Sequence, residues 1–243
     1  MKSINKRHIT LMAFFLLLGC QGEQKSVKIS YQVYGKLMEI MQHNQLQARV
    51  NLNDLQLGKN SYGLGAMEGL QGEILISQGE VITSVANPDS ILVQNSNAFG
   101  AALLVTAEVE SWQEVEINES VDLKSLESVI EFQAETSNLN ANDVIPFKIE
   151  ANPKSLNWHI INASLAEEQN HQAYKESGRA GILRSQKVEI IGFYSKNHQG
   201  VFTHHGSFLH LHFITADGSL MGHVDDLQID GNWKIYLPKA PQP

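Results

Sequence analysis

The segment Phe208-Leu209-His210-Leu211-His212-Phe213-Ile214 alternates apolar and imidazole side chains, and this alternation predicts a β-strand. In a strand, residues two apart share a face, so His210 and His212 point to one side and the leucines to the other. Just beyond it, Asp217-Gly218 predicts a tight type I′ turn, whose two central residues both need positive φ. The segment is therefore expected to form the first strand of a hairpin.

The predicted turn determines which residues face one another across the hairpin. If Ala216 pairs with Ser219, counting outward places His223 opposite His212, with Cβ atoms about 5 Å apart. A lone His-x-His on a strand is more often coincidence than a ligand pair, but a third histidine in register predicts a three-histidine metal site with open positions. A one-residue error in the turn would move His223 to the opposite face.

One carboxylate shares the predicted metal face. Asp225 falls opposite His210 in the same register. We expect Asp225 to lie outside the ligand set and to orient a ligand histidine through a hydrogen bond.

The N-terminus has the pattern of a secretion signal. Lys2, Lys6 and Arg7 precede an apolar run at residues 11–18, which ends in Gly19-Cys20 and is too short to span a bilayer. The pattern resembles a bacterial lipoprotein signal, so we expect residues 1–19 to be removed, Cys20 to be lipidated and residues 20–28 to form a tether. The protein would then be exported and lipid-anchored, at the outer membrane in a Gram-negative cell; an ordinary cleaved signal is the alternative.

Composition limits the classes of function. Cys20 is the only cysteine, so residues 29–243 hold no disulfide and no thiol ligand. Removing residues 1–19 takes away three positive charges and no negative ones, so the net charge goes from −8 to −11. Such an acidic surface argues against binding nucleic acid or anionic lipid. About 220 remaining residues can bury the core of one β-rich domain or of two joined halves.

The pattern along the chain favours an α+β fold rich in antiparallel or mixed strands. A helix is expected at residues 36–45, a hairpin closed at Gln78-Gly79, and a solvated loop or short helix at residues 163–178. Further strands are expected at residues 29–34, 102–109, 144–149, 158–161, 188–194 and 227–237.

Several short motifs carry a resemblance to a known family. They are Tyr31-Gln32-Val33, Asn60-Ser61-Tyr62-Gly63-Leu64-Gly65, Gly69-Leu70-Gln71-Gly72-Glu73, Ile191-Gly192-Phe193, His210-Leu211-His212-Phe213 and Gly222-His223-Val224. In combination they resemble the acetolactate decarboxylases, zinc-dependent carboxy-lyases that convert 2-acetolactate to acetoin and carbon dioxide.

The resemblance implies a fold, a cofactor and a substrate. It implies a barrel-like, two-part fold in which His210, His212 and His223 bind Zn²⁺ and Glu73 lies beside the metal; other divalent transition metals also suit three imidazoles. The substrate would be a small 2-hydroxy-3-keto acid. A homodimer is one assembly that the resemblance allows, and the oligomeric state stays open.

Two departures from the family pattern leave two hypotheses. His159 stands where the family has an arginine that meets the substrate carboxylate, and we expect no counterpart of the family's second catalytic glutamate after His223. The first hypothesis is a decarboxylase in which Glu73 and His159 carry protons, and a protonated His159 could also pair with the carboxylate. The second is an exported lipoprotein that binds a metal or small ligand without catalysis.

Three further histidines and two further enzyme classes give alternative interpretations. His198, His204 and His205 are either extra imidazoles near the site or part of an exposed loop. A cupin-type dioxygenase is disfavoured because no glutamate follows His212 closely, and a serine hydrolase because no Gly-x-Ser-x-Gly motif occurs.

Overall fold

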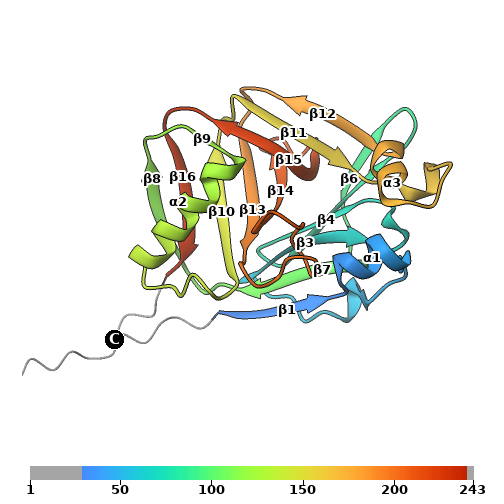
Figure 1. Ribbon diagram of the computed structural model, residues 1–243, viewed down its shortest axis with the longest axis horizontal. Coiled ribbons are helices and arrows are strands. Elements are labelled where there is room, and N and C mark those ends of the chain that lie inside the picture. The colour runs from blue at the N-terminus through green and yellow to red at the C-terminus, as the bar shows by residue number, and fades with distance from the viewer. Residues whose placement is uncertain (1–28, 240–243) are drawn as a thin grey trace, which may run out of the picture.

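Two antiparallel sheets make up the body of the protein, which a computed structural model describes for residues 29–239. The predicted signal, the lipidation site Cys20 and the tether lie outside the described residues. Each sheet is built from a continuous half of the chain, so the two halves appear as the blue-to-green and green-to-red parts of the ribbon (Figure 1).

The first half forms a seven-stranded sheet with the order β1-β7-β3-β4-β5-β6, in which β2 also pairs with β7. Its strands are β1 (Ser30–Tyr34), β2 (Val50–Asn51), β3 (Ser61–Met67), β4 (Glu73–Ser77), β5 (Glu80–Ala86), β6 (Ile91–Asn95) and β7 (Gly100–Glu108). The turn between β4 and β5 is the expected one, because Gln78 and Gly79 both have positive φ.

The second half forms a nine-stranded sheet with the order β12-β11-β15-β14-β13-β10-β16-β8, and β9 pairs with β15. Its strands are β8 (Trp112–Ile117), β9 (Val121–Asp122), β10 (Ile145–Ala151), β11 (Ser155–Ile160), β12 (Arg179–Leu183), β13 (Val188–Tyr194), β14 (Leu209–Thr215), β15 (Met221–Ile229) and β16 (Trp233–Pro238). All the ladders are antiparallel, and neither sheet closes into a barrel within residues 29–239.

One strand expectation is wrong. The run predicted as a single strand at residues 227–237 is the end of β15 and the whole of β16, separated by a turn. Gly231 in that turn has φ +76, a left-handed conformation that breaks a strand.

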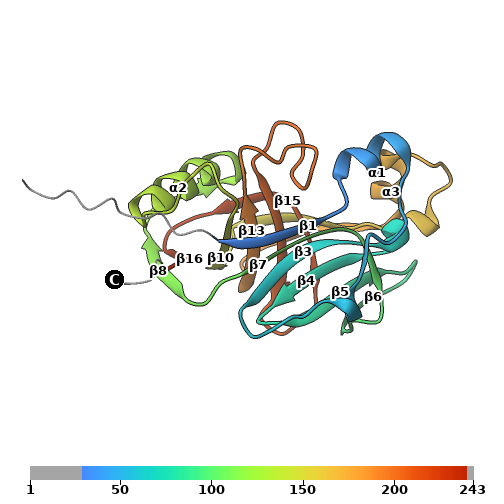
Figure 2. The ribbon, with the colours of Figure 1, turned by 90° about the horizontal axis from the view of Figure 1, so that it is seen from below.

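Residues 29–239 form three α-helices, which lie at the two ends of this part of the chain (Figures 1 and 2). They are α1 (Leu37–His43), α2 (Leu123–Thr136) and α3 (His171–Ser177), and short 3-10 turns occur at Leu52–Asp54, Glu68–Leu70 and Ala163–Leu165. Helix α2 lies beside the nine-stranded sheet and buries Leu126, Ile130 and Ala134 on one face. Helices α1 and α3 lie together at the opposite end, where the Tyr174 hydroxyl donates to Asn44 Oδ1 at 2.7 Å.

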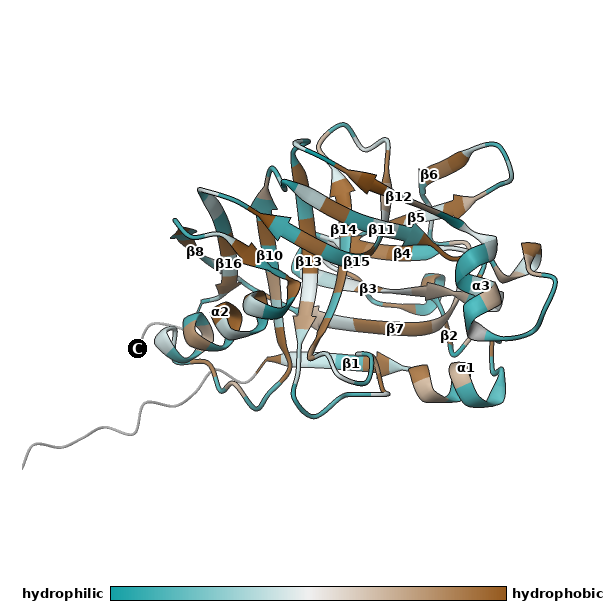
Figure 3. Cartoon of the chain, turned by 45° about the horizontal axis from the view of Figure 1, so that its top comes forward, coloured by the Kyte–Doolittle hydropathy of each residue, from teal (hydrophilic) through white to brown (hydrophobic). Residues whose placement is uncertain are grey.

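The hydrophobic core joins the two sheets. Its main cluster runs from Leu64 and Leu75 in the first sheet to Phe147, Phe193 and Phe213 in the second. Strand β13 packs on β3, and β15 packs on β4. Buried polar residues, among them Glu73 on β4 and His223 on β15, also lie where the two sheets meet. Brown and teal residues alternate along many strands and along α2, whereas α3 is mostly teal (Figure 3). Among the described residues, no helix combines the length and apolar character needed to cross a membrane.

Candidate metal centre

The hairpin β14–β15 brings the three predicted histidines together. His212 pairs with His223 in the register that the sequence predicts. The ring centre of His210 lies 5.1 Å from the ring centre of His212 and 5.1 Å from that of His223. The ring centres of His212 and His223 are 5.4 Å apart. One ligand nitrogen from each ring lies within 4.8 Å of the other two.

The turn at the end of this hairpin is not the predicted type I′. Gly218 has positive φ but Asp217 does not, and Gly218 N–H donates to Thr215 O at 2.8 Å. The Asp217 carboxylate accepts hydrogen bonds from the Thr215 hydroxyl at 2.6 Å and from Ser219 N at 3.1 Å. These side-chain bonds shape the loop in place of a second residue with positive φ, and the pairing of His212 with His223 is unchanged.

Burial makes the three imidazoles suitable for a metal ion. It lowers the pKa of His212 to about 3 and holds those of His210 and His223 well below the ordinary value, so all three rings are neutral at pH 7. A neutral imidazole has a free lone pair for a metal, and Nε2 of His212 has no hydrogen-bond partner although it is buried. Zinc binds nitrogen at about 2.0–2.1 Å, so nitrogens that lie within 4.8 Å of one another could share an ion after small side-chain movements.

Glu73, the first residue of β4, approaches the three histidines from the other sheet. Only 3% of it is exposed, and its Oε2 lies 3.6 Å from Nε2 of His212. Ile161 N–H donates to Oε1 at 3.0 Å. Burial raises the pKa of Glu73 to about 7, although the nearby His159 and the Ile161 hydrogen bond oppose the rise. This carboxyl can therefore exist with or without its proton near neutral pH.

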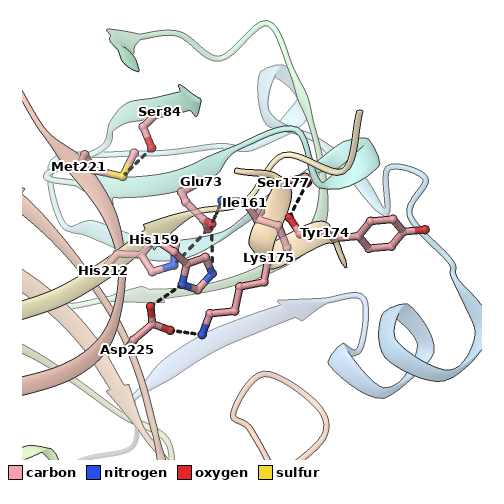
Figure 4. A network of polar contacts seen from close by, with 10 residues as sticks. All are labelled: Glu73, Ser84, His159, Ile161, Tyr174, Lys175, Ser177, His212, Met221 and Asp225. Atoms are coloured by element: carbon pink, nitrogen blue, oxygen red, sulfur yellow. Dashed lines mark hydrogen bonds and ion pairs between the residues drawn. The ribbon is translucent and has the colours of Figure 1, made fainter. Parts of the chain in front are cut away.

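His159 lies between two carboxylates. It is on β11, paired with His223 on β15, and the two ring centres are 4.8 Å apart. Its Nδ1 donates to Asp225 Oδ2 at 2.9 Å, since an ionised carboxylate can only accept, and its Nε2 lies 4.0 Å from Glu73 Oε1 (Figure 4). The ring is thus held with Nε2 turned toward Glu73.

Asp225 has a different partner from the one that the sequence suggests. We expected it opposite His210, but a β-bulge in the pairing of β11 with β15 leaves it between the paired residues Val224 and Asp226. Burial disfavours its charge, but His159 and Lys175 outweigh this effect and its pKa is lowered. It therefore orients His159 rather than one of the three predicted ligands.

Lys175 belongs to this group of residues, although the sequence does not predict it. Its Nζ donates to Asp225 Oδ1 at 2.6 Å from helix α3, in the segment that was expected to be a solvated loop or short helix (Figure 4). No motif in the sequence marks this residue, because the contact joins elements that are 50 residues apart.

Most of these residues, but not His212 or Asp225, line one pocket with about 580 Å³ of empty space, its open mouth included. Polar side chains in its wall are Glu73, His159, Lys175, His204, His210 and His223, and apolar ones include Leu37, Ile40, Leu70 and Phe202. The other two histidines in question lie elsewhere: His198 Nδ1 is 2.8 Å from the Ser195 hydroxyl and the ring stacks on Phe202, and His205 is exposed.

A second group, His159, His223 and Asp225, also has donor atoms within 4.8 Å of one another. Both Asp225 oxygens in this group are already engaged, one by His159 and one by Lys175. The group of His210, His212 and His223 has no such internal ion pair and is the better candidate for a metal ion.

The fold and the site together define an α+β protein of two antiparallel sheets whose buried three-histidine group could hold a metal ion. A sequence model of the family described as alpha-acetolactate decarboxylase matches residues 31–241. The chain therefore belongs to the alpha-acetolactate decarboxylase family.

Known relatives agree with this assignment. The alpha-acetolactate decarboxylase of Brevibacillus brevis is 25% identical over 206 residues, which cover 85% of this chain and 68% of that protein. A Staphylococcus aureus protein of unknown function, described as similar to alpha-acetolactate decarboxylase, has the same fold with a TM-score of 0.71 at 15% identity, over 87% of this chain and 86% of that one. The alpha-acetolactate decarboxylase of Bacillus subtilis strain 168 has a TM-score of 0.71 at 14% identity, covering 86% and 85% of the two chains.

Proposed function

We propose that the protein is a metal-dependent carboxy-lyase that converts 2-acetolactate to acetoin and carbon dioxide. The observation that carries the proposal is the group of His210, His212 and His223, whose ligand nitrogens lie within 4.8 Å of one another beside the buried Glu73. Family membership over residues 31–241 supports the reaction class.

In this proposal the three histidines hold Zn²⁺ or a similar divalent ion. Bound there, the ion would supply Lewis acidity to the hydroxyl and keto oxygens of a 2-hydroxy-3-keto acid. The donor set fits, because three neutral imidazoles beside an open pocket are typical of catalytic rather than structural zinc sites.

Glu73 and His159 are the proposed proton carriers. Loss of carbon dioxide leaves an electron pair that must receive one proton, which requires an acid within reach and of suitable pKa. Glu73, with its pKa near 7, meets the second requirement, and the pocket that it lines meets the first. His159 Nε2 faces Glu73 Oε1 at 4.0 Å and can exchange a proton with it through a small movement or a water molecule.

The apolar part of the wall helps this chemistry by excluding water. Leu37, Ile40 and Leu70 line the same pocket as the polar residues. Fewer waters around the reacting carbon strengthen the electrostatic interactions in the pocket and reduce proton transfer from solvent at the wrong face.

The test is to purify the full-length protein, measure its metal content and assay acetoin formation from 2-acetolactate with and without a chelator. We expect about one divalent ion per chain, activity that chelation removes, and recovery of activity when the ion returns. Retention of the metal without any acetoin would instead favour a non-catalytic metal- or ligand-binding lipoprotein.

Glu73→Gln provides the matching variant, because glutamine keeps the size of the side chain and cannot carry the proton. The loss of turnover should be about 10²-fold to 10⁴-fold with metal retained. Unchanged turnover would remove Glu73 from the mechanism.

We also propose that the protein is exported and anchored through a lipid on Cys20, within the Leu17-Leu18-Gly19-Cys20 motif. Labelled palmitate should enter the protein in bacterial cells and should fail to enter Cys20→Ser. Equal labelling of both proteins would contradict the anchor.

A further inference from the structure

The pocket holds one fixed positive charge. Of its lining residues in the described part of the chain, Lys175 is the only lysine or arginine. Arg179, which is close in sequence, is turned away and donates to the backbone carbonyls of Asn87 and Pro88. Apart from a metal ion on the histidines, Lys175 is therefore the one full cationic partner that the lining side chains offer to an anionic ligand.

The rest of the lining is unfavourable to an anion. Glu73 is a carboxyl group, and Leu37, Ile40, Leu70 and Phe202 in the same wall are apolar. These side chains cannot offset the cost of removing water from a carboxylate, whereas Lys175 can. The acidic balance of the whole chain, −8, adds to this cost at long range.

Lys175 has spare capacity for a second acceptor. Its ammonium has three donors, and the structure uses one of them in the 2.6 Å hydrogen bond to Asp225 Oδ1. Its side chain is 39% exposed, so the ammonium can be reached from the pocket mouth. Asp225 keeps its bond from His159 at Oδ2 when Lys175 turns toward a ligand.

Helix α3 holds Lys175 in place. The Asn170 side chain caps the helix by accepting from Ala173 N at 2.9 Å. Tyr174 ties the helix to Asn44 at the end of α1, and the Ser177 hydroxyl donates to Asn162 O at 2.5 Å. The helix therefore positions the lysine at the pocket by contacts on both sides of it.

We propose that Lys175 binds the carboxylate of the substrate and makes the pocket specific for anionic 2-hydroxy acids. This inference rests on the proposed function, because it takes the 2-hydroxy-3-keto acid as the substrate. It assigns carboxylate binding to α3 and leaves His159 free for proton transfer.

The test measures binding without turnover. The probes are 2-hydroxy-2-methylpropanoate, which has the hydroxyl and carboxylate but no keto group to react, and its neutral amide of nearly the same shape. Calorimetry on the metal-loaded full-length protein should show a preference for the carboxylate. In Lys175→Gln the carboxylate should bind about tenfold or more weakly while the amide is unaffected, since a charge-assisted hydrogen bond is lost. Lys175→Arg should keep most of the preference.

Lys234→Gln is the matched control. Lys234 forms an ion pair of the same kind with Glu114, at 2.7 Å, and its side chain is also 39% exposed, but it does not line the pocket. This variant should bind both probes like the unaltered protein.

Three results would overturn the inference: no preference for the carboxylate in the unaltered protein, equal weakening of both probes in Lys175→Gln, or loss of the preference in His159→Gln alone. The last result would return carboxylate binding to His159. The proposed function fails separately, if the unaltered protein binds the hydroxy acid through Lys175 but forms no acetoin.

Discussion

His159 and His223 face each other across neighbouring strands, yet the two imidazoles have opposite surroundings. His223 belongs to a group of three neutral, buried rings, and burial lowers the pKa of each. His159 is joined by a hydrogen bond to Asp225, which in turn accepts a hydrogen bond from Lys175. Two histidines whose ring centres are 4.8 Å apart are therefore suited to different roles: His223 to metal binding and His159 to proton transfer.

The difference shows that burial and hydrogen-bond partners determine which role an imidazole can take in a site. Imidazoles without a carboxylate partner keep their lone pairs for a cation that comes from outside. An imidazole with a carboxylate on one nitrogen has a fixed tautomer, and its other nitrogen can accept or release a proton. The experiments below separate these two roles.

His212→Ala should have the largest effect. It removes one of three predicted ligands, so metal affinity should fall by more than about 100-fold and activity should fall with it. Metal content by mass spectrometry is the measurement, and His43→Ala, an exposed histidine on α1, is the control. A His212→Ala protein that keeps its metal would contradict the three-histidine centre.

His159→Ala should give the opposite pattern. We expect full metal content and a loss of turnover of about 10²-fold to 10⁴-fold, because a proton carrier is lost while the ligands remain. Metal content and acetoin formation are measured on the same preparation. Loss of metal together with turnover would show that His159 is itself a ligand, as in the group with His223 and Asp225.

Acid should destabilise the metal-free protein. The three buried histidines have lowered pKa values in the folded state, whereas in the unfolded chain they titrate near 6.5, so the unfolded state binds more protons below that pH. The histidines should therefore leave the free energy of unfolding unaffected above pH 7 and lower it below pH 6.5, by up to about 1.4 kcal/mol per pH unit for each histidine. Glu73 opposes part of this loss, because its raised pKa of about 7 lets the folded state bind a proton that the unfolded state binds only near pH 4.5. Urea unfolding at pH 7.5, 6.5 and 5.5 measures this slope.

The metal-loaded protein is the comparison for the acid experiment. Bound metal should reduce the loss of stability until protons displace it from the imidazoles. Equal slopes with and without metal would mean that these histidines do not hold the ion.

Gly218→Ala should have the smallest effect. The substitution forces alanine into φ +69 with no heavy atom within 4 Å of the new Cβ, so only the backbone preference opposes it, at about 1 kcal/mol. Gly58→Ala is the control, because its Cβ also meets nothing within 4 Å and its φ is not positive. Urea unfolding measures both, and metal content should stay unchanged; a loss of metal would mean that the turn, rather than strand pairing, sets the histidine register.

The sequence predicts the group of three histidines because the pattern that indicates it lies within one short segment. Alternation along residues 208–214 and one turn predicted that His212 and His223 pair, although the turn differs in type. The pairing survives because it depends on where the reversal is centred, and both turn types centre it at the same point. The conformation of Asp217 depends instead on side-chain bonds to Thr215 and Ser219, which the dipeptide alone does not reveal.

Other features were missed for two different reasons. Helix α2 had a usable signal, since Asp122 and Ser125 form a capping box and Leu126, Ile130 and Ala134 are spaced four apart. The Asp230-Gly231 dipeptide is likewise a turn signal, and it could have predicted the turn between β15 and β16. Lys175 and the bulge at Asp225 had no such signal, because they depend on how α3 and β11 pack against β15.

The division of the chain into two sheets has a consequence for how the site assembles. All three histidines of the metal group come from the later half of the chain, and Glu73 comes from the earlier half. The three imidazoles can therefore come together as soon as this hairpin forms, whereas Glu73 joins them only when the two sheets pack. Substitutions that weaken the packing of β4 on β15 should therefore separate Glu73 from the histidines and leave the histidine group assembled.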